Sequence, residues 1–173
     1  MSLSLYDAVV PPYRQLVGSV IGILEKGAEH YRADGRSPDD LLGVRLFEDM
    51  YPLTFQLHSV AHHTLGALEG VKAGAFGPPR NLDELDYAGF QARLDSVASK
   101  LAALTPDEVN ACSGKDVTFS LGDYKLPFTA EGFLFSFSKP NAYFHATTAY
   151  DLLRMKGVPL GKRDYMGQMQ LKA

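Results

Sequence analysis

The sequence has one cysteine and no apolar stretch of about 18 residues, and both shortages limit the class of protein. Cys112 has no second cysteine with which to form an internal disulfide, and no histidine near it in the sequence could activate its thiol. The N-terminal residues lack the charged and apolar regions of a signal peptide. We therefore expect a cytoplasmic protein without a transmembrane segment or a catalytic thiol.

Clustered charge of one sign is also missing. The chain has 17 Lys and Arg against 20 Asp and Glu, a net charge of −3, and no block of like charges. Nucleic acids and acidic membrane surfaces attract proteins with clustered Lys and Arg, so we expect neither as a partner. No Gly-x-x-x-x-Gly-Lys-Ser/Thr phosphate loop and no Gly-x-Ser-x-Gly nucleophile elbow occurs.

The sequence does contain helical periodicity. Its 173 residues, 46% of them hydrophobic, are enough for one domain with one core, covering residues 1–173. Apolar residues recur three and four positions apart in four ranges, which predicts four long amphipathic helices in an antiparallel-type bundle. The ranges are 3–30, 53–70, 85–104 and 129–156.

Proline and glycine predict the interruptions. Pro11-Pro12 should kink the first helix, or its regular part should begin at Pro11, because proline has no N–H donor and clashes with the preceding turn. Pro140 should divide the last helix, and Gly157 should end it. Residues 71–80 contain two glycines and two prolines, which is typical of a loop. Residues 158–173 form a C-terminal tail.

One short stretch, residues 116–128, alternates with the period of a strand instead. Gly122-Asp123 is a two-residue turn signal, so Leu121 should face Tyr124 in a β-hairpin. This register puts the apolar residues of both strands on one side of the hairpin. We expect that side to lie on the bundle as a lid, because an isolated hairpin is barely stable. The fold class is therefore all-α with a small hairpin between the third and fourth long helices.

Four of the five histidines lie in two of the predicted helices. On a helical wheel, His58 and His62 flank the buried stripe of the second helix on one side, as neighbours four residues apart. His63 lies about 100° beyond His62, which predicts an exposed ring. His145 lies within the apolar stripe of the last helix and should point inward.

Two interpretations of these histidines remain open. His58, His62 and His145 could meet across the bundle as three ligands of zinc, nickel or iron(II), with one position left for a substrate. Alternatively, His145 is a core histidine hydrogen-bonded to Asn141, a backbone carbonyl or a tyrosine. Asn141 and Thr148 share the inward stripe with His145, and Tyr143 lies on another side that suits an interface or surface cleft. We take these three as candidates for lining a pocket.

Two segments carry a resemblance to a known family. Residues 140–167, from Pro140 to Gly167, and residues 49–56, from Asp49 to Gln56, resemble a bacterial domain family of unknown function within the DinB/YfiT-like superfamily. The resemblance extends over nearly the whole chain, including the hairpin. It implies an up-down-down-up four-helix bundle that is commonly a homodimer.

The same resemblance also bears on metal binding. Metal-binding members of the superfamily use one histidine from the second helix and a His-x-x-x-His pair from the last, and some are thiol-dependent S-transferases. Here His58 and His145 can take two of these places, but Asn141 and Ala149 occupy the positions four residues from His145. We therefore expect a bundle that binds a small ligand, or retains a decayed site, without strong metal binding. The alternative is a metal-dependent S-transferase or hydrolase.

Overall fold

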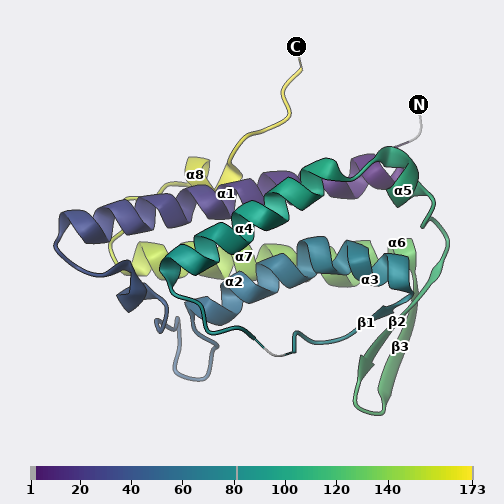
Figure 1. Ribbon diagram of the computed structural model, residues 1–173, viewed down its shortest axis with the longest axis horizontal. Coiled ribbons are helices and arrows are strands. Elements are labelled where there is room, and N and C mark those ends of the chain that lie inside the picture. The colour runs from purple at the N-terminus through teal and green to yellow at the C-terminus, as the bar shows by residue number, and fades with distance from the viewer. Residues whose placement is uncertain (1–2, 81, 173) are drawn as a thin grey trace.

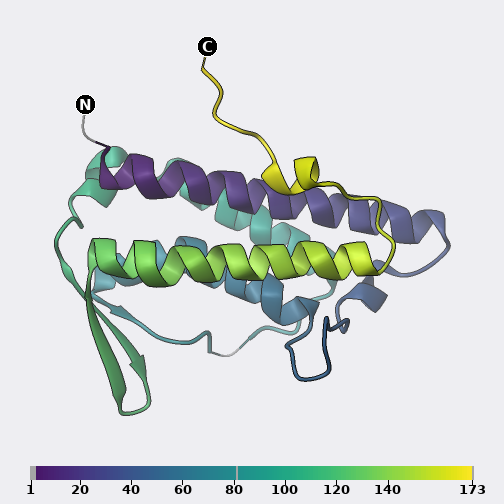
Figure 2. The same ribbon diagram turned by 180° about the vertical axis from the view of Figure 1, so that it is seen from behind.

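The computed structural model describes residues 3–80 and 82–172, and it is mostly helical with a small three-stranded sheet (Figure 1). The long helical segments lie side by side, as both views show (Figure 2). They are α1 (Leu5–Ala33), the continuous α2 (Leu53–Ala61), η2 (His62–Gly66) and α3 (Ala67–Ala73), α4 (Tyr87–Ala103), and the continuous α6 (Ala130–Gly132), η3 (Phe133–Ser138) and α7 (Lys139–Met155). Short helices are η1 (Pro38–Leu41), α5 (Pro106–Asn110) and α8 (Lys162–Met166). No helix in the described ranges has the length and apolar character needed to cross a membrane.

The first helix, α1, continues through Pro11 and Pro12 instead of starting there. It begins at Leu5, after Ser4 caps the Asp7 N–H. Pro12 has no N–H to donate to the carbonyl of Ala8, four residues earlier. Lys139 of α7 replaces the missing donor, with Nζ 2.8 Å from that carbonyl oxygen. A contact from another helix therefore satisfies the carbonyl that Pro12 leaves free.

The second long helical segment contains one π-helical stretch, η2, between α2 and α3. The whole segment starts at Leu53. Gly74, with a φ of +71°, caps its end a few residues beyond the predicted one. A π-helical turn shifts the regular hydrogen bonds and leaves a backbone carbonyl without its usual partner. Ser138 Oγ donates to the His63 carbonyl at 2.8 Å, and Tyr13 Oη lies 2.8 Å from Ser138 Oγ.

The last long helical segment passes Pro140 without a break, because the π-helical stretch η3 lies directly before it. The prediction that Pro140 divides this helix is wrong. Its end is as predicted, since Gly157 adopts a φ of +88°. The predicted tail contains α8. An ion pair joins α8 to α1, with Lys26 Nζ 2.5 Å from Asp164 Oδ1.

The predicted hairpin register is confirmed. Strands β2 (Asp116–Leu121) and β3 (Tyr124–Thr129) pair so that Leu121 faces Tyr124 and Val117 faces Phe128. A third strand, β1 (Ala75–Phe76), pairs with β2 in parallel inside the range 71–80 that was predicted to be loop. Two residues are too few for a strand period to appear in the sequence.

The hairpin does not lie on the helices as a complete lid. It projects from one end of the helical body (Figure 1). Val117 at its root is buried, and Phe119 packs against Phe137 with ring centroids 4.9 Å apart. Leu121 and Tyr124 at the tip are 56% and 60% exposed. The lid prediction is therefore wrong for the tip, because only the root reaches the last helical segment.

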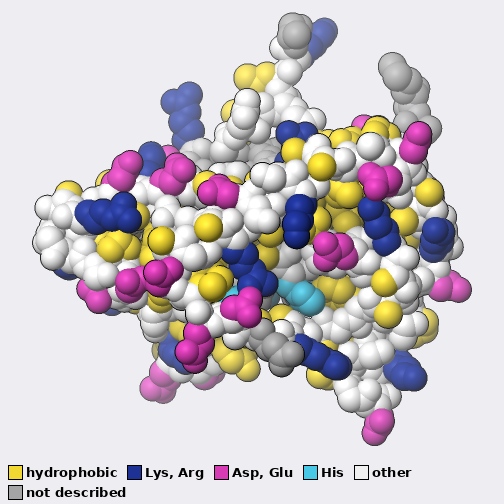
Figure 3. Space-filling model, viewed as in Figure 1, with side chains coloured by type: hydrophobic (Ala, Val, Ile, Leu, Met, Phe, Trp, Pro, Cys, Tyr) yellow, Lys and Arg dark blue, Asp and Glu magenta, His cyan; other side chains and the backbone are white. Residues whose placement is uncertain are grey.

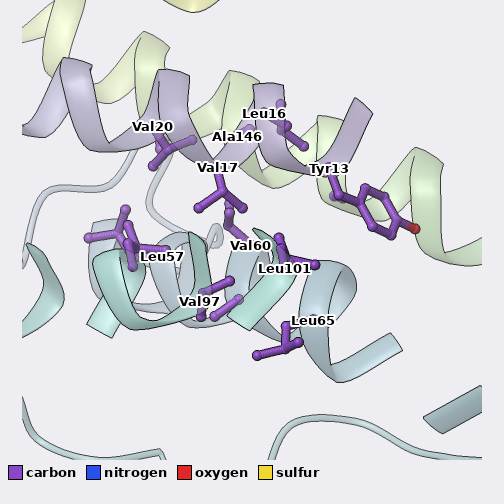
Figure 4. Packing of buried hydrophobic residues seen from close by; sticks show 14 of the residues in the cluster. Tyr13, Leu16, Val17, Val20, Leu57, Val60, Leu65, Val97, Leu101 and Ala146 are labelled. Atoms are coloured by element: carbon purple, nitrogen blue, oxygen red, sulfur yellow. The ribbon is translucent and has the colours of Figure 1, made fainter. Parts of the chain in front are cut away.

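The core lies where the long helical segments meet (Figure 4). The side chains in this view are apolar, and almost all are less than one tenth exposed. Burial of each large side chain stabilises the fold by about 1.5–3 kcal/mol. They include Tyr13, Val17 and Val20 of α1, Leu57 and Val60 of α2, Val97 and Leu101 of α4, and Ala146 of α7.

Candidate functional site

Two histidines of the second long helical segment lie on its side toward α4. His58 is buried, with its ring 4.9 Å from that of Phe90 in α4, and His62 is half-buried. His58 Nε2 lies 3.1 Å from the carbonyl oxygen of Asp83, and His62 Nε2 lies 2.7 Å from that of Gly77. The two rings therefore hold the segment between β1 and α4 at both of its ends.

These bonds fix the tautomer of both rings. A carbonyl oxygen only accepts hydrogen bonds, so each Nε2 carries the hydrogen and each Nδ1 of the neutral ring is an acceptor. His58 Nδ1 is buried and has no partner among the described residues. His62 Nδ1 is neither bonded within the described ranges nor buried. It lies beside Gly66, where a Cβ atom would be 3.5 Å away.

His62 and Gly66 belong to the wall of a cleft of about 420 Å³. The cleft lies between α2 and η2 on one side and α4 on the other, and Pro79, Arg80 and Leu82 from the segment between β1 and α4 also line it. Figure 3 shows His side chains (cyan) in the middle of this face, with Lys and Arg (dark blue) around them and acidic side chains interspersed. The residues that line the cleft are His58, Ala61, His62, Leu65, Gly66, Glu69, Pro79, Arg80, Leu82, Arg93, Ser96, Val97 and Lys100.

Both rings of this cleft are neutral near pH 7. Burial lowers the pKa of His58 below the ordinary histidine value, and the Arg93 guanidinium lowers it further. Burial also lowers the pKa of His62, although its bond to the Gly77 carbonyl partly offsets this effect. A neutral His62 presents a lone pair at Nδ1, which suits an O–H or N–H donor of a ligand.

His63 and His145 form a second cluster where the second segment packs against α7, and the His63 ring lies 5.2 Å from that of His62. Their rings are stacked, with centroids 5.7 Å apart and an interplanar angle of 14°. His145 Nδ1 lies 2.8 Å from Gln56 Oε1. Gln56 Nε2 donates to the Tyr51 carbonyl at 2.9 Å, which directs the amide oxygen toward the ring. His145 therefore carries its hydrogen on Nδ1, the opposite tautomer to that of His58 and His62.

Burial is the main reason that neither ring of this cluster protonates readily. It lowers the pKa of His63 to about 3, assisted by repulsion from the rings of His62 and His145. It lowers the pKa of His145 to about 4, assisted by repulsion from His62. The inward position predicted for His145 is confirmed, with 9% of the residue exposed. The exposed position predicted for His63 is wrong, since it is 7% exposed.

The error at His63 has a simple geometric cause. The wheel places His63 on the flank of the buried stripe opposite to His62, and α7 covers that flank. A periodic pattern locates the centre of a stripe but does not show how far the neighbouring helices extend around it. The π-helical stretch also begins at His62 and changes the phase of the residues after it.

The three predicted metal ligands are divided between these two groups. His58 and His62 line the cleft and use Nε2 for backbone carbonyls, whereas His145 belongs to the cluster with Gln56. Across residues 3–80 and 82–172, no group of three or more His, Cys, Asp or Glu is arranged to hold a metal ion. These residues therefore do not fit the three-ligand centre that the family resemblance implies. Metal binding by them stays a prediction.

The three candidate pocket residues of the last helix lie outside the cleft. Asn141 Nδ2 donates to the Phe137 carbonyl at 2.7 Å, and Thr148 Oγ1 donates to the Phe144 carbonyl at 2.8 Å. Both side chains therefore bond within their own helical segment. Tyr143 is 38% exposed. The partner of His145 is Gln56 rather than Asn141.

Sequence reasoning missed the polar residues that complete both groups. Gln56 lies three residues after Leu53 and four before Val60, so it is a polar residue on an apolar stripe, and this signal was available. The cleft residues Arg80 and Arg93 gave no comparable signal. Their position depends on the path of residues 77–86, and that path has no periodicity.

Comparison with solved structures supports the same fold. A crystal structure described as a DinB family member protein from Shewanella denitrificans is similar to this chain with a TM-score of 0.82. The two share 26% sequence identity over 98% of this chain and 95% of the other. None of the curated proteins matches the chain.

A family model covers most of the chain as well. It matches residues 5–166, which include all the long helical segments, the sheet and α8. The match thus spans both histidine groups and all the residues that line the cleft. The chain belongs to the family described as a domain of unknown function, DUF1993.

Proposed function

We propose that this DinB-like protein binds a small organic molecule in the cleft between η2 and α4, without a metal ion. The observation that carries the proposal is the His62 ring. Its Nε2 is held by the Gly77 carbonyl at 2.7 Å, and its Nδ1 is left as an acceptor beside Gly66. A ring fixed in this way can bind a hydroxyl or amino group of a ligand without rearrangement.

The dimensions of the cleft agree with this function. Its volume of about 420 Å³ lies within the range of about 300–1,000 Å³ that is common for small-molecule sites. Leu65 and Val97 supply apolar surface, and a few polar groups surround it. Such sites typically combine an apolar wall with a small number of fixed polar groups.

Two further points remain part of the proposal. The up-down-down-up order of the four long helical segments is supported by their course in Figure 1. The homodimer that the family resemblance implies stays a prediction.

The proposal is tested by mapping where small molecules bind. A mixture of small aromatic fragments that carry hydroxyl or amino groups is added to the ¹⁵N-labelled protein in the presence of EDTA, and amide chemical shifts are recorded. We expect the shifts to concentrate on Leu65, Gly66 and Val97. Gly66→Ala should weaken them, because the added methyl group would lie on the wall of the cleft, 3.5 Å from His62 Nδ1.

The matched control is Gly22→Ala. Gly22 also lies inside a helix, and a Cβ atom there would meet nothing within 4 Å, so the substitution adds the same methyl group away from the cleft. It should leave the fragment map unchanged. Shifts that concentrate elsewhere, or that Gly66→Ala leaves unchanged, would contradict the proposed site. A map that appears only when zinc replaces EDTA would contradict the proposal and support the metal-dependent alternative.

A further inference from the structure

The wall of the cleft is positively charged, although the chain as a whole is negative. Three cations line it, Arg80, Arg93 and Lys100, against one carboxylate, Glu69. The whole chain has a net charge of −3. A hollow whose wall carries an excess of positive charge attracts ligands of negative charge.

These cations differ in what they already bind. Arg93 Nη1 lies 3.0 Å from Asp83 Oδ2, so it holds the segment between β1 and α4 beside the bond between His58 and the Asp83 backbone. Within the described ranges, no carboxylate lies at salt-bridge distance from Arg80 or Lys100. Arg80 comes from the segment between β1 and α4, and Lys100 from α4. Two cations without an internal partner therefore lie on different walls of one hollow.

The histidines add no competing positive charge. Both rings are neutral, and His62 offers only the lone pair of Nδ1 toward the cleft. Different residues therefore suit different parts of a ligand. The two cations suit a negatively charged group, and His62 suits a neighbouring hydroxyl or amino donor.

We infer that the ligand of the cleft is a small organic anion, whose carboxylate or phosphate group is bound by Arg80 and Lys100. The inference rests on the proposed function and adds the chemical class of the ligand. It also assigns Arg93 to a separate task, which is to hold the segment between β1 and α4 through Asp83.

The charge of the ligand is tested with a matched pair of probes, mandelate and mandelamide. Both have the same ring and the same hydroxyl donor for His62, and only mandelate carries a negative charge. We expect mandelate to bind about three- to tenfold more tightly, measured by titration of the Gly66 and Val97 amide shifts. Its dissociation constant should rise with salt concentration, while that of mandelamide should not.

Substitutions then test which cations bind the negative group of the ligand. Arg80→Gln and Lys100→Gln should each weaken mandelate binding about threefold and leave mandelamide binding unchanged. Lys125→Gln removes one positive charge from the hairpin, outside the cleft, and should change neither constant. If mandelate binds no better than mandelamide, the inference is wrong. The proposed function is tested separately by the fragment map. Equal effects of Lys100→Gln and Lys125→Gln would also contradict it.

Discussion

Neighbouring histidines of the second helical segment belong to two groups that differ in position and in tautomer, and His145 of α7 completes the second group. His58 and His62 face a cleft and donate from Nε2 to backbone carbonyls. His63 and His145 are stacked in the interior, and His145 donates from Nδ1 to a glutamine. The first group lines the cleft, whereas the second lies where the second helical segment packs against α7. Histidines that are adjacent in sequence can therefore have unrelated roles.

The largest expected effect is the loss of stability in acid that His63 and His145 cause. Neutral rings are required in the folded state, whereas unfolded histidine protonates near pH 6.5. Because the folded pKa values of His63 and His145 lie near 3 and 4, the unfolded chain binds more protons below pH 6.5. Each ring then lowers the free energy of unfolding by up to about 1.4 kcal/mol per pH unit as pH falls toward 4. Urea unfolding at pH 7, 6, 5 and 4 measures this slope.

The control for this slope is His63→Leu, which removes one buried titrating ring and keeps an apolar side chain. Its free energy of unfolding should depend less steeply on pH than that of the original protein. Equal slopes for the two proteins would show that His63 titrates as an exposed histidine. The contrast between the two groups would then be wrong.

A smaller effect is expected from removing the His145 ring. His145→Ala leaves a cavity and deprives Gln56, itself 2% exposed, of its donor. The expected loss is about 2–3 kcal/mol at pH 7.5, measured by urea unfolding. His62→Ala should cost about 1 kcal/mol or less, because that ring is half-buried at the edge of the cleft. A larger loss from His62→Ala would reverse the assignment of the two groups.

The sequence predicted local features well because each has a local cause. Gly157 ends the last long helix, and Gly122 turns the hairpin in the predicted register. The errors came from contacts between distant segments. Pro12 is tolerated because Lys139 donates to the Ala8 carbonyl.

The same limit applies to the candidate site. The sequence grouped the histidines by helix, which placed His58 and His62 together correctly. It did not divide them from His145, because that division depends on Gln56 facing α7. It did not find the cleft either, because residues 77–86 have no periodic pattern that reveals their path across α2 and α4.

The smallest expected effect is a gain in stability. Gly66→Ala should raise the free energy of unfolding by about 0.5–1 kcal/mol, since alanine favours helix more than glycine does. The added Cβ has room, with its nearest neighbour, His62 Nδ1, 3.5 Å away. The variant should therefore be more stable than the original protein and bind more weakly in the cleft. Reduced stability in urea unfolding would mean that the methyl group does not fit.

The most direct test of the account is ¹⁵N NMR of the imidazole nitrogens, with and without mandelate. We expect the hydrogen on Nε2 in His58 and His62 and on Nδ1 in His145, as their partners require. Mandelate should shift the His62 Nδ1 signal and leave the His145 signals unchanged. If His145 carries its hydrogen on Nε2, or if His62 and His145 respond to the ligand together, the division into a cleft group and a second group at α7 is contradicted.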